Sequence, residues 1–568
     1  MILSVVLMRR QSYRYGGNCM KKMKAIFIAC AIVCMSMPLI CCGGNGKSHT
    51  NGKTQAGSGE IAGWTLNKDK PVSFDWYINF SWFTRHWGDS LVSKYITEKT
   101  GVDINFIVPA GNEAEKLNAM IAGDALPDII TLGWWEGQVP MMIDAGLVEP
   151  LDELAKKYDP YFFKVANKDR LSWYTQQDGH IYGYPNASFT PSDYEKYAGK
   201  LTSNETFLVR KDIYESIGKP DMTTPEGFLG ALRAAKTGFP KVNGQPLIPF
   251  VTDEFTDTGC SHLQKYLTHF LAISPEKNGS FIDAELGLTE NSEYLRWMKT
   301  FRRAHQEGLI PTDIFVDKRA QIEEKTAQGR YFCMLYQNWD IQAAQDTLYT
   351  KDPNSVYIAV NGPKNTQGDA PTLSGGGISG WTITLISKNC KDKARAIQFL
   401  SYLISEEGQM DTNFGIKDKT YTVDANGIPR FTPEVAQLNQ TDKNKQESEI
   451  GIQYTYWMLM DNAWQAQWGV EYSPAYAQPQ LWTRPYVHSF AVYDGLILPV
   501  ASDERIIHED IQRRWGKVIS LLIRAPSDKE FDRIVDEFNQ YKKEKGIDKV
   551  VAAQTKLMNA NKTKLGMR

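Results

Sequence analysis

Residues 126–132, LPDIITL, are the stretch that decides the fold. This short apolar run is typical of a strand that is buried on both faces of a parallel sheet. Two further strands are expected at residues 71–80 and 102–108, with helices at residues 90–100 and 112–121 between the three. Gly101 and Gly123 end these helices. Strands that alternate with helices predict an α/β fold, in which ligands bind at the carboxyl ends of the strands.

The length and the aromatic content point to two lobes and a ligand. A chain of 568 residues is too long for one compact domain, and its 42% hydrophobic and 23% charged residues are ordinary for a folded protein. Aromatic residues make up 12%, with 15 Trp and 27 Tyr. A tryptophan is seldom buried completely, because its ring is large and its N–H needs a partner. Some of these rings are therefore expected to face a ligand.

Residues 1–41 are typical of a signal peptide. Lys21, Lys22 and Lys24 precede an apolar run at residues 25–40, which is short for a membrane span. A start at Met20 would place these lysines at the amino terminus. Residues 42–65 begin with a stretch rich in Gly, Asn, Ser and Lys, which is typical of a flexible tether.

The end of the apolar run, LICCGG at residues 39–44, resembles the lipobox of bacterial lipoproteins. That resemblance implies that Cys42 receives a lipid and becomes the mature amino terminus. Cys41 stands where the motif usually has Gly, Ala or Ser. The alternative is a plain secretory signal with two incidental cysteines.

The cysteines and the net charge of the mature chain argue against a disulfide-stabilised fold and against nucleic acid as a partner. Cys260, Cys333 and Cys390 are odd in number and widely spaced, so they form no disulfide framework. Residues 1–41 hold six Lys or Arg and no acidic residue, which leaves 58 basic and 66 acidic residues, a net charge of −8. That charge argues against nucleic acid as a partner. The sequence lacks HExxH, Cys/His, phosphate-loop and dinucleotide motifs, so neither a metal nor a cofactor is expected.

Several motifs along the mature chain resemble one family. The motifs are AMIAG at 119–123 followed by LPDII at 126–130, DGHIYGYP at 178–185, LVRKD at 208–212, GRYFCML at 329–335, and the helix ARAIQFLSYLISEEG at 394–408. Together they resemble the extracellular solute-binding proteins of the maltose-binding type, and within these the LipO-like lipoproteins of carbohydrate ABC transporters. The helix at 394–408 is the most specific of the motifs, because the helix, its terminating residues SEEG at 405–408 and the spacing all agree with the family. Ala396, Phe399, Leu400 and Leu403 fall on one face of this helix.

The resemblance implies a two-lobed periplasmic-binding-protein fold of type II, with a ligand cleft between the lobes and a helical C-terminal extension. We expect lobe 1 at residues 66–185 and 361–425, and lobe 2 at residues 186–360 and 426–568. Crossings between the lobes are expected near residues 184–186, near 361–376 and after about 426. The function implied is capture of a carbohydrate, expected to be an oligosaccharide, and its delivery to the permease subunits of an ABC importer. The protein is expected to be a monomer held at the extracytoplasmic face of the cell membrane through its N-terminal lipid alone.

A sugar receptor needs aromatic surfaces for the C–H faces of the sugar, and carboxylates and amides for its hydroxyls. The sequence places such residues in the loops expected at strand ends and crossings. The candidates are Trp82, Trp87, Trp134, Trp135, Glu136, Tyr184, Asn186, Trp339, Asp340, Gly376 and Trp381. For each tryptophan the alternative is a place in the core.

Two other functions remain compatible with the composition. A secreted glycoside hydrolase would also be acidic and rich in aromatics, and its two carboxylates can come from distant segments. A receptor for another solute, such as a peptide, or one that signals to a sensor kinase, would use the same fold.

Overall fold

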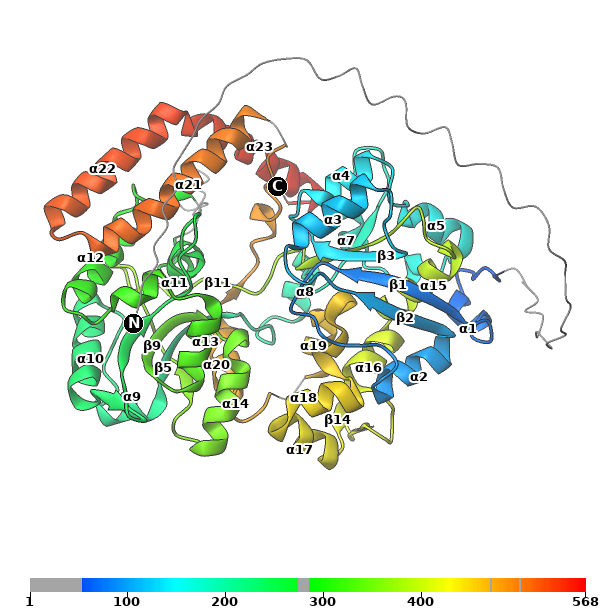
Figure 1. Ribbon diagram of the computed structural model, residues 1–568, viewed down its shortest axis with the longest axis horizontal. Helices are drawn as coiled ribbons and strands as arrows, with labels where there is room; N and C mark the ends of the chain where they lie inside the picture. Colours follow the sequence, from blue (N-terminus) through cyan, green and yellow to red (C-terminus); the bar gives the residue numbers. More distant parts are fainter. Residues whose placement is uncertain (1–53, 274–285, 470–471, 500–501, 568) are drawn as a thin grey trace, which may run out of the picture. The chain divides into compact units, whose positions relative to one another are not determined.

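The sequence folds into two α/β lobes, each built on its own sheet (Figure 1). The computed structural model describes residues 54–273, 286–469, 472–499 and 502–567. Within these ranges, no helix is both long and apolar enough to span a bilayer. The leader, Cys42 and most of the expected tether lie outside the described residues.

Lobe 1 contains a sheet in the order β2-β1-β3-β12-β4. Strands β1 (Val72–Ile78), β2 (Val102–Ile107) and β3 (Ile129–Gly133) are parallel, and they lie where the apolar runs predict strands. Strand β12 (Thr382–Ile386) joins them antiparallel and pairs on its other side with β4 (Gly183–Pro185). The lobe is therefore completed by a strand from much later in the chain.

Helices bury both faces of this sheet. Leu117 of α3 (Glu113–Ala122) and Met142 of α4 (Gln138–Asp144) pack on one face. On the other face lie α2 (Leu91–Thr100) and α15 (Lys393–Ile404), the helix that carries the most specific family motif. Gly101 ends α2 in the left-handed conformation, at φ 70°, and a Cβ there would lie 2.3 Å from the carbonyl oxygen of Lys68.

Lobe 2 contains a sheet in the order β10-β5-β9-β8. Strand β9 (Tyr331–Gln337) pairs antiparallel with β5 (Glu205–Arg210) and parallel with β8 (Ile248–Val251), and β10 (Tyr357–Ala359) forms the edge. Helices α10 (Pro225–Gly238) and α12 (Ser292–Gln306) pack in its core.

Three helices follow in the C-terminal part: α21 (Asp503–Arg524), α22 (Asp528–Lys545) and α23 (Ile547–Lys564). Helix α21 runs beside α12 and α22 (Figure 1). Trp515, Phe531 and Phe538 are buried in the same core as Trp297 of α12. The helical extension thus belongs to lobe 2.

The lobe boundaries differ from the expected ones at two places. Leu373, which the sequence predicts in lobe 1, is buried in the core of lobe 2. The second difference lies in the C-terminal part. The sequence predicts residues 426–568 in lobe 2, but Val435 and residues 452 and 456–460 pack in the core of lobe 1. The physical reason is apolar burial: Trp457, Met458 and Leu459 lie against α15 and the first sheet. The third crossing therefore comes after α19 (Asn462–Trp468) and before α20 (Ala477–Thr483), which packs on β5 and β10.

The end of the expected tether is also a structural element. Residues 54–67, which we call the N-terminal clip, pack on lobe 1. The main-chain N–H of Gly57 donates to the carbonyl of Tyr158 at 2.9 Å. Trp64 is 3% exposed and packs edge-on against Tyr161 and Tyr402. A flexible segment can therefore extend only to about residue 53, not to residue 65.

Candidate functional site

The sequence candidates of lobe 1 meet at one edge of its sheet. Trp82 follows β1, and Trp134, Trp135 and Glu136 follow β3. Trp381 directly precedes β12, whose first residue, Thr382, pairs antiparallel with Gly133. The start of β12 therefore lies beside the carboxyl end of β3, which brings these residues together as expected for a doubly wound fold.

Four rings form an aromatic platform at this edge: Phe80, Trp82, Trp381 and Trp457. The rings of Trp82 and Trp381 are stacked, with centroids 5.9 Å apart and an angle of 5° between their planes. Trp457 lies 4.5 Å from Trp381 and 5.4 Å from both Phe80 and Trp82. Trp82 is 56% exposed although it is a large apolar side chain. An exposed indole supported from behind by other rings is suited to stack on the C–H face of a ligand.

Carboxylates lie next to this platform. Glu136 accepts hydrogen bonds from the main-chain N–H of Gly133 at 2.7 Å and from Asn79 Nδ2 at 2.6 Å. Burial raises the pKa of Glu136, and the negative charge of Glu113 raises it further. Glu113 itself accepts from the main-chain N–H of Ser81 at 3.2 Å. Asn79 and Ser81, the two neighbours of Phe80 in the loop after β1, thus each donate a hydrogen bond to an acidic side chain.

The two adjacent tryptophans after β3 have different surroundings. Trp134 Nε1 donates to the carbonyl of Gly380 at 2.9 Å, one residue before Trp381. Trp135 is perpendicular to Trp134, with centroids 5.9 Å apart, and is 49% exposed. Trp134 therefore helps to hold the segment before Trp381 in place. Trp135 instead has an exposed ring that a ligand could contact.

Four other candidates of this half have structural contacts. Trp87 packs 4.8 Å from Tyr456, and its Nε1 donates to Thr97. Tyr184 is 3% exposed and lies in the core of lobe 1. Asn186 is buried; its amide donates to the carbonyl of Trp457 and its oxygen accepts from the N–H of Thr382. Gly376, at φ 118°, accepts a hydrogen bond from the Tyr194 hydroxyl through its carbonyl. These residues hold the platform and the crossings in place.

The candidates of lobe 2 stand at the carboxyl end of β9. The main-chain N–H of Trp339 donates to Asn204 Oδ1 at 2.8 Å, and its side chain is 38% exposed. Asp340 pairs with Arg319 at 2.6 Å, and burial raises its pKa to about 6. Asp253 follows β8, which is parallel to β9, so it lies at the same edge of the sheet. The second lobe thus repeats the combination of an exposed indole with carboxylates.

Some residues of the site are not evident from sequence. Phe80 and Asn79 directly follow β1, and a rule that takes every residue after a buried strand would include them. Trp457 comes from a short 3-10 segment (Gln453–Leu459) with no strand pattern next to it. Only tertiary packing places Trp457 against Trp381, and no local signal could have identified it.

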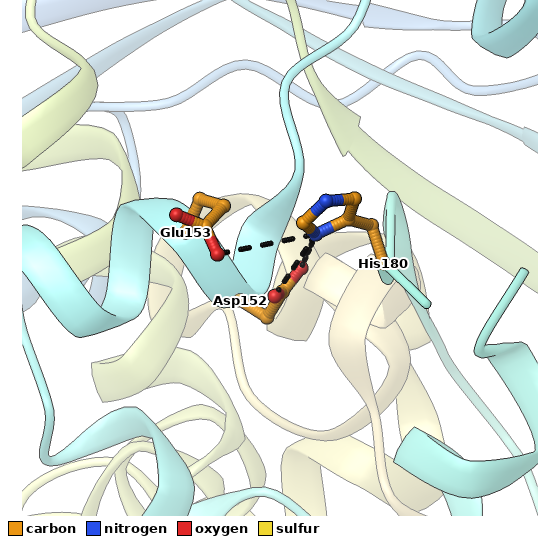
Figure 2. Close-up of side chains that lie close together, drawn as sticks. All are labelled: Asp152, Glu153 and His180. Atoms are coloured by element: carbon orange, nitrogen blue, oxygen red, sulfur yellow. Dashed lines mark hydrogen bonds and ion pairs between the residues drawn. The ribbon is translucent and has the colours of Figure 1, made fainter. Parts of the chain in front are cut away.

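One group of possible metal ligands lies elsewhere on lobe 1 (Figure 2). His180 Nδ1 is 3.2 Å from Asp152 Oδ2 and 4.0 Å from Glu153 Oε1. Lys156 Nζ, however, lies 2.9 Å from Asp152 and 2.8 Å from Glu153. An ammonium group therefore already pairs with both carboxylates. The cluster is explained as a group of ion pairs on the surface of α5 (Leu151–Tyr158).

Comparisons with known proteins agree with this architecture. The sequence model of a family described as bacterial extracellular solute-binding protein matches residues 91–418. The fructooligosaccharide ABC transporter substrate-binding protein FusA of Streptococcus pneumoniae is 25% identical over 234 residues, which are 40% of this chain and 42% of that protein. The aligned part thus spans less than half of that relative.

Solved structures share the fold over most of the chain. FusA of S. pneumoniae in complex with kestose matches with a TM-score of 0.59 and 18% identity, over 87% of this chain and 100% of its own. An extracellular solute-binding protein from Bifidobacterium longum subsp. infantis matches with a TM-score of 0.62 and 15% identity, over 87% and 99%. At these identities the likeness establishes the two-lobed fold.

Proposed function

This chain belongs to the family of bacterial extracellular solute-binding proteins, and on that premise we propose that it is the substrate-binding component of an ABC importer. It captures a carbohydrate, an oligosaccharide, between its two lobes and delivers it to the permease subunits. The chain is a binding protein and not an enzyme, as the family is one of solute-binding proteins. The secreted glycoside hydrolase that the composition leaves open is therefore set aside.

The aromatic platform is the observation that carries this proposal. The exposed face of Trp82 backed by Trp381 offers the flat apolar surface on which the C–H face of a sugar ring stacks. Glu136 and Asn79 beside it offer the acceptors and donors that hydroxyl groups need. The ligand named for the FusA relative, a fructooligosaccharide, is of the same chemical class.

The proposal is tested by a thermal-shift screen of the purified protein against oligosaccharides and peptides. A ligand that binds only the folded state raises the melting temperature. We expect oligosaccharides to raise it and to be recovered intact by mass spectrometry. If only peptides raise the melting temperature, the solute is a peptide and not a carbohydrate. Recovery of a cleaved saccharide would contradict the binding function.

We further propose that the protein is anchored to the outer face of the cell membrane through a lipid on Cys42 and acts as a monomer. The lipobox-like residues 39–44 support the anchor, and the polar composition of residues 43–53 supports a tether behind it. The test is membrane fractionation of wild type and of Cys42→Ser. Wild type should sediment with membranes and the variant should be released. Equal amounts of both in the soluble fraction would contradict the anchor.

A further inference from the structure

The carboxylates of the site have few cationic partners. Among the residues that the structure describes, neither Glu113 nor Glu136 forms an ion pair within 4.0 Å. Their bonds come from the neutral donors of Ser81, Gly133 and Asn79. Among the described residues, both carboxylates therefore lie beside the aromatic platform without a cation bound to them.

Lys116, which lies on the same helix as Glu113, is directed to other groups. Lys116 Nζ donates to the carbonyl of Val108 at 3.0 Å and lies 5.6 Å from the centre of the Tyr77 ring. The hydroxyl of Tyr77 in turn donates to Asn79 at 2.9 Å, and Asn79 donates to Glu136. Lys116 therefore forms no ion pair with Glu136; Tyr77 and Asn79, which are neutral, lie between the two charged groups.

The edge of the second lobe adds further negative charge. Arg319 pairs with Asp340, so that pair is neutral. Asp253 lies 3.7 Å from His262, which is 2% exposed. Burial lowers the pKa of His262, so the ring is neutral at pH 7 and does not offset the charge of Asp253. At the second crossing, Asp494 accepts from the main-chain N–H of Ser379 at 2.7 Å; burial raises its pKa, and the positive charge of Lys265 acts against that rise, so Asp494 adds little to the negative charge.

We infer that the site selects saccharides without negative charge, and that Glu113 and Glu136 are the residues that exclude uronate, sulfated or sialylated sugars. A carboxylate of the ligand stacked on Trp82 would lie beside two acidic side chains that pair with no cation among the residues the structure describes. Like charges brought together in a partly desolvated site repel each other and weaken binding, whereas the hydroxyls of a neutral sugar can donate to the same carboxylates. This inference rests on the proposed function, because it specifies the ligand of that same site.

The test compares matched ligands by isothermal titration calorimetry. β-1,4-mannooligosaccharides and oligomannuronates of equal length differ only in the oxidation of C6, and neutral and acidic glycan mixtures extend the comparison. We expect each neutral glycan that binds to do so at least about tenfold more tightly than its acidic counterpart. An acidic glycan that binds as tightly as its neutral counterpart would overturn the inference and leave the proposed function standing. Binding of neither class would instead contradict the proposed function.

The double variant Glu113→Gln and Glu136→Gln identifies the residues responsible. Glutamine keeps the size but has only one accepting oxygen, whereas both oxygens of Glu136 accept, so the melting temperature should fall modestly and the variant should stay folded. The preference for neutral over acidic ligands should fall by about tenfold, and high salt should reduce it in wild type also. Glu115→Gln is the matched control, because Glu115 lies on the same helix but is exposed and bonds only to Asn112. An unchanged preference in the folded double variant would overturn the assignment.

Discussion

At the scale of single residues, the exposed indole of Trp82 is the most informative side chain. Substituting Trp82→Ala should weaken oligosaccharide binding by about tenfold or more, because it removes the stacking surface. The melting temperature without ligand should change little, since 56% of the side chain is already exposed. Titration calorimetry measures the first effect and thermal unfolding the second.

Phe163→Ala is the control for that substitution. Phe163 is 36% exposed and packs against Phe162 on lobe 1, away from the platform. Its removal should leave the affinity unchanged. If Trp82→Ala binds as wild type does, or if Phe163→Ala weakens binding equally, the platform is not the binding surface.

Asp159 gives a prediction about stability and pH. It is completely buried, its Oδ1 accepts from the main-chain N–H of Gly63 at 3.0 Å, and burial raises its pKa from 3.8 to about 6. A raised carboxyl pKa means that ionisation disfavours the folded state, so stability is lost as the pH rises from about 4 to about 6 and stays reduced above that. Asp159→Asn keeps the acceptor without the charge.

The variant Asp159→Asn should therefore be more stable than wild type at pH 7.5, by about 1–3 kcal/mol. This advantage should vanish as the pH is lowered to about 4. Urea unfolding at several pH values measures the difference, with the exposed Asp144→Asn as control. A difference that does not depend on pH would show that the charge of Asp159 costs nothing in the fold.

The sequence predicts the position of some residues at this edge of the sheet and not of others. Trp82, Trp134, Trp135 and Trp381 follow or precede strands, and strand positions are encoded locally by apolar runs. Burial is not encoded in this way: Tyr184 and Asn186 also sit at a strand end, but their side chains are enclosed by residues from distant segments.

At the scale of elements, the N-terminal clip is the least expected feature. Trp64→Ala should lower the free energy of unfolding by about 3–5 kcal/mol, because its ring fills a site in the core between Tyr161 and Tyr402. Deletion of residues 43–53 should have no such effect, as their composition is that of a tether. Thermal unfolding of both variants checks this. Equal melting temperatures would mean that the clip is not part of the folded lobe.

Elements built from neighbouring segments were predictable, whereas those built from distant segments were not. Strands β1, β2 and β3 and the helices between them follow from local apolar patterns. The antiparallel pairing of β12 with β3 and β4 joins residues some 200 or more positions apart, and no local pattern specifies it. The same holds for residues 456–460, whose apolar side chains could fill the core of either lobe until the packing is known.

At the scale of the whole molecule, the chain between residues 54 and 567 crosses between two lobes three times. Direct contacts join the lobes as well: Lys443 Nζ lies 3.3 Å from Gln342 Oε1, and Lys564 Nζ donates to the carbonyl of Trp173 at 3.1 Å. Two lobes joined by such crossings are expected to close by hinge motion around a ligand. A ligand that bridges exposed indoles on both lobes, Trp82 and Trp339, would favour the closed form.

Titration calorimetry of the full-length mature protein with oligosaccharides, combined with mass spectrometry of the recovered ligand, tests the central claim most directly. We predict saturable binding of an oligosaccharide at one site, recovery of the ligand intact, and at least about tenfold weaker binding to the Trp82→Ala variant. The claim would be contradicted if no saccharide bound to the folded protein, or if the saccharide were recovered in cleaved form.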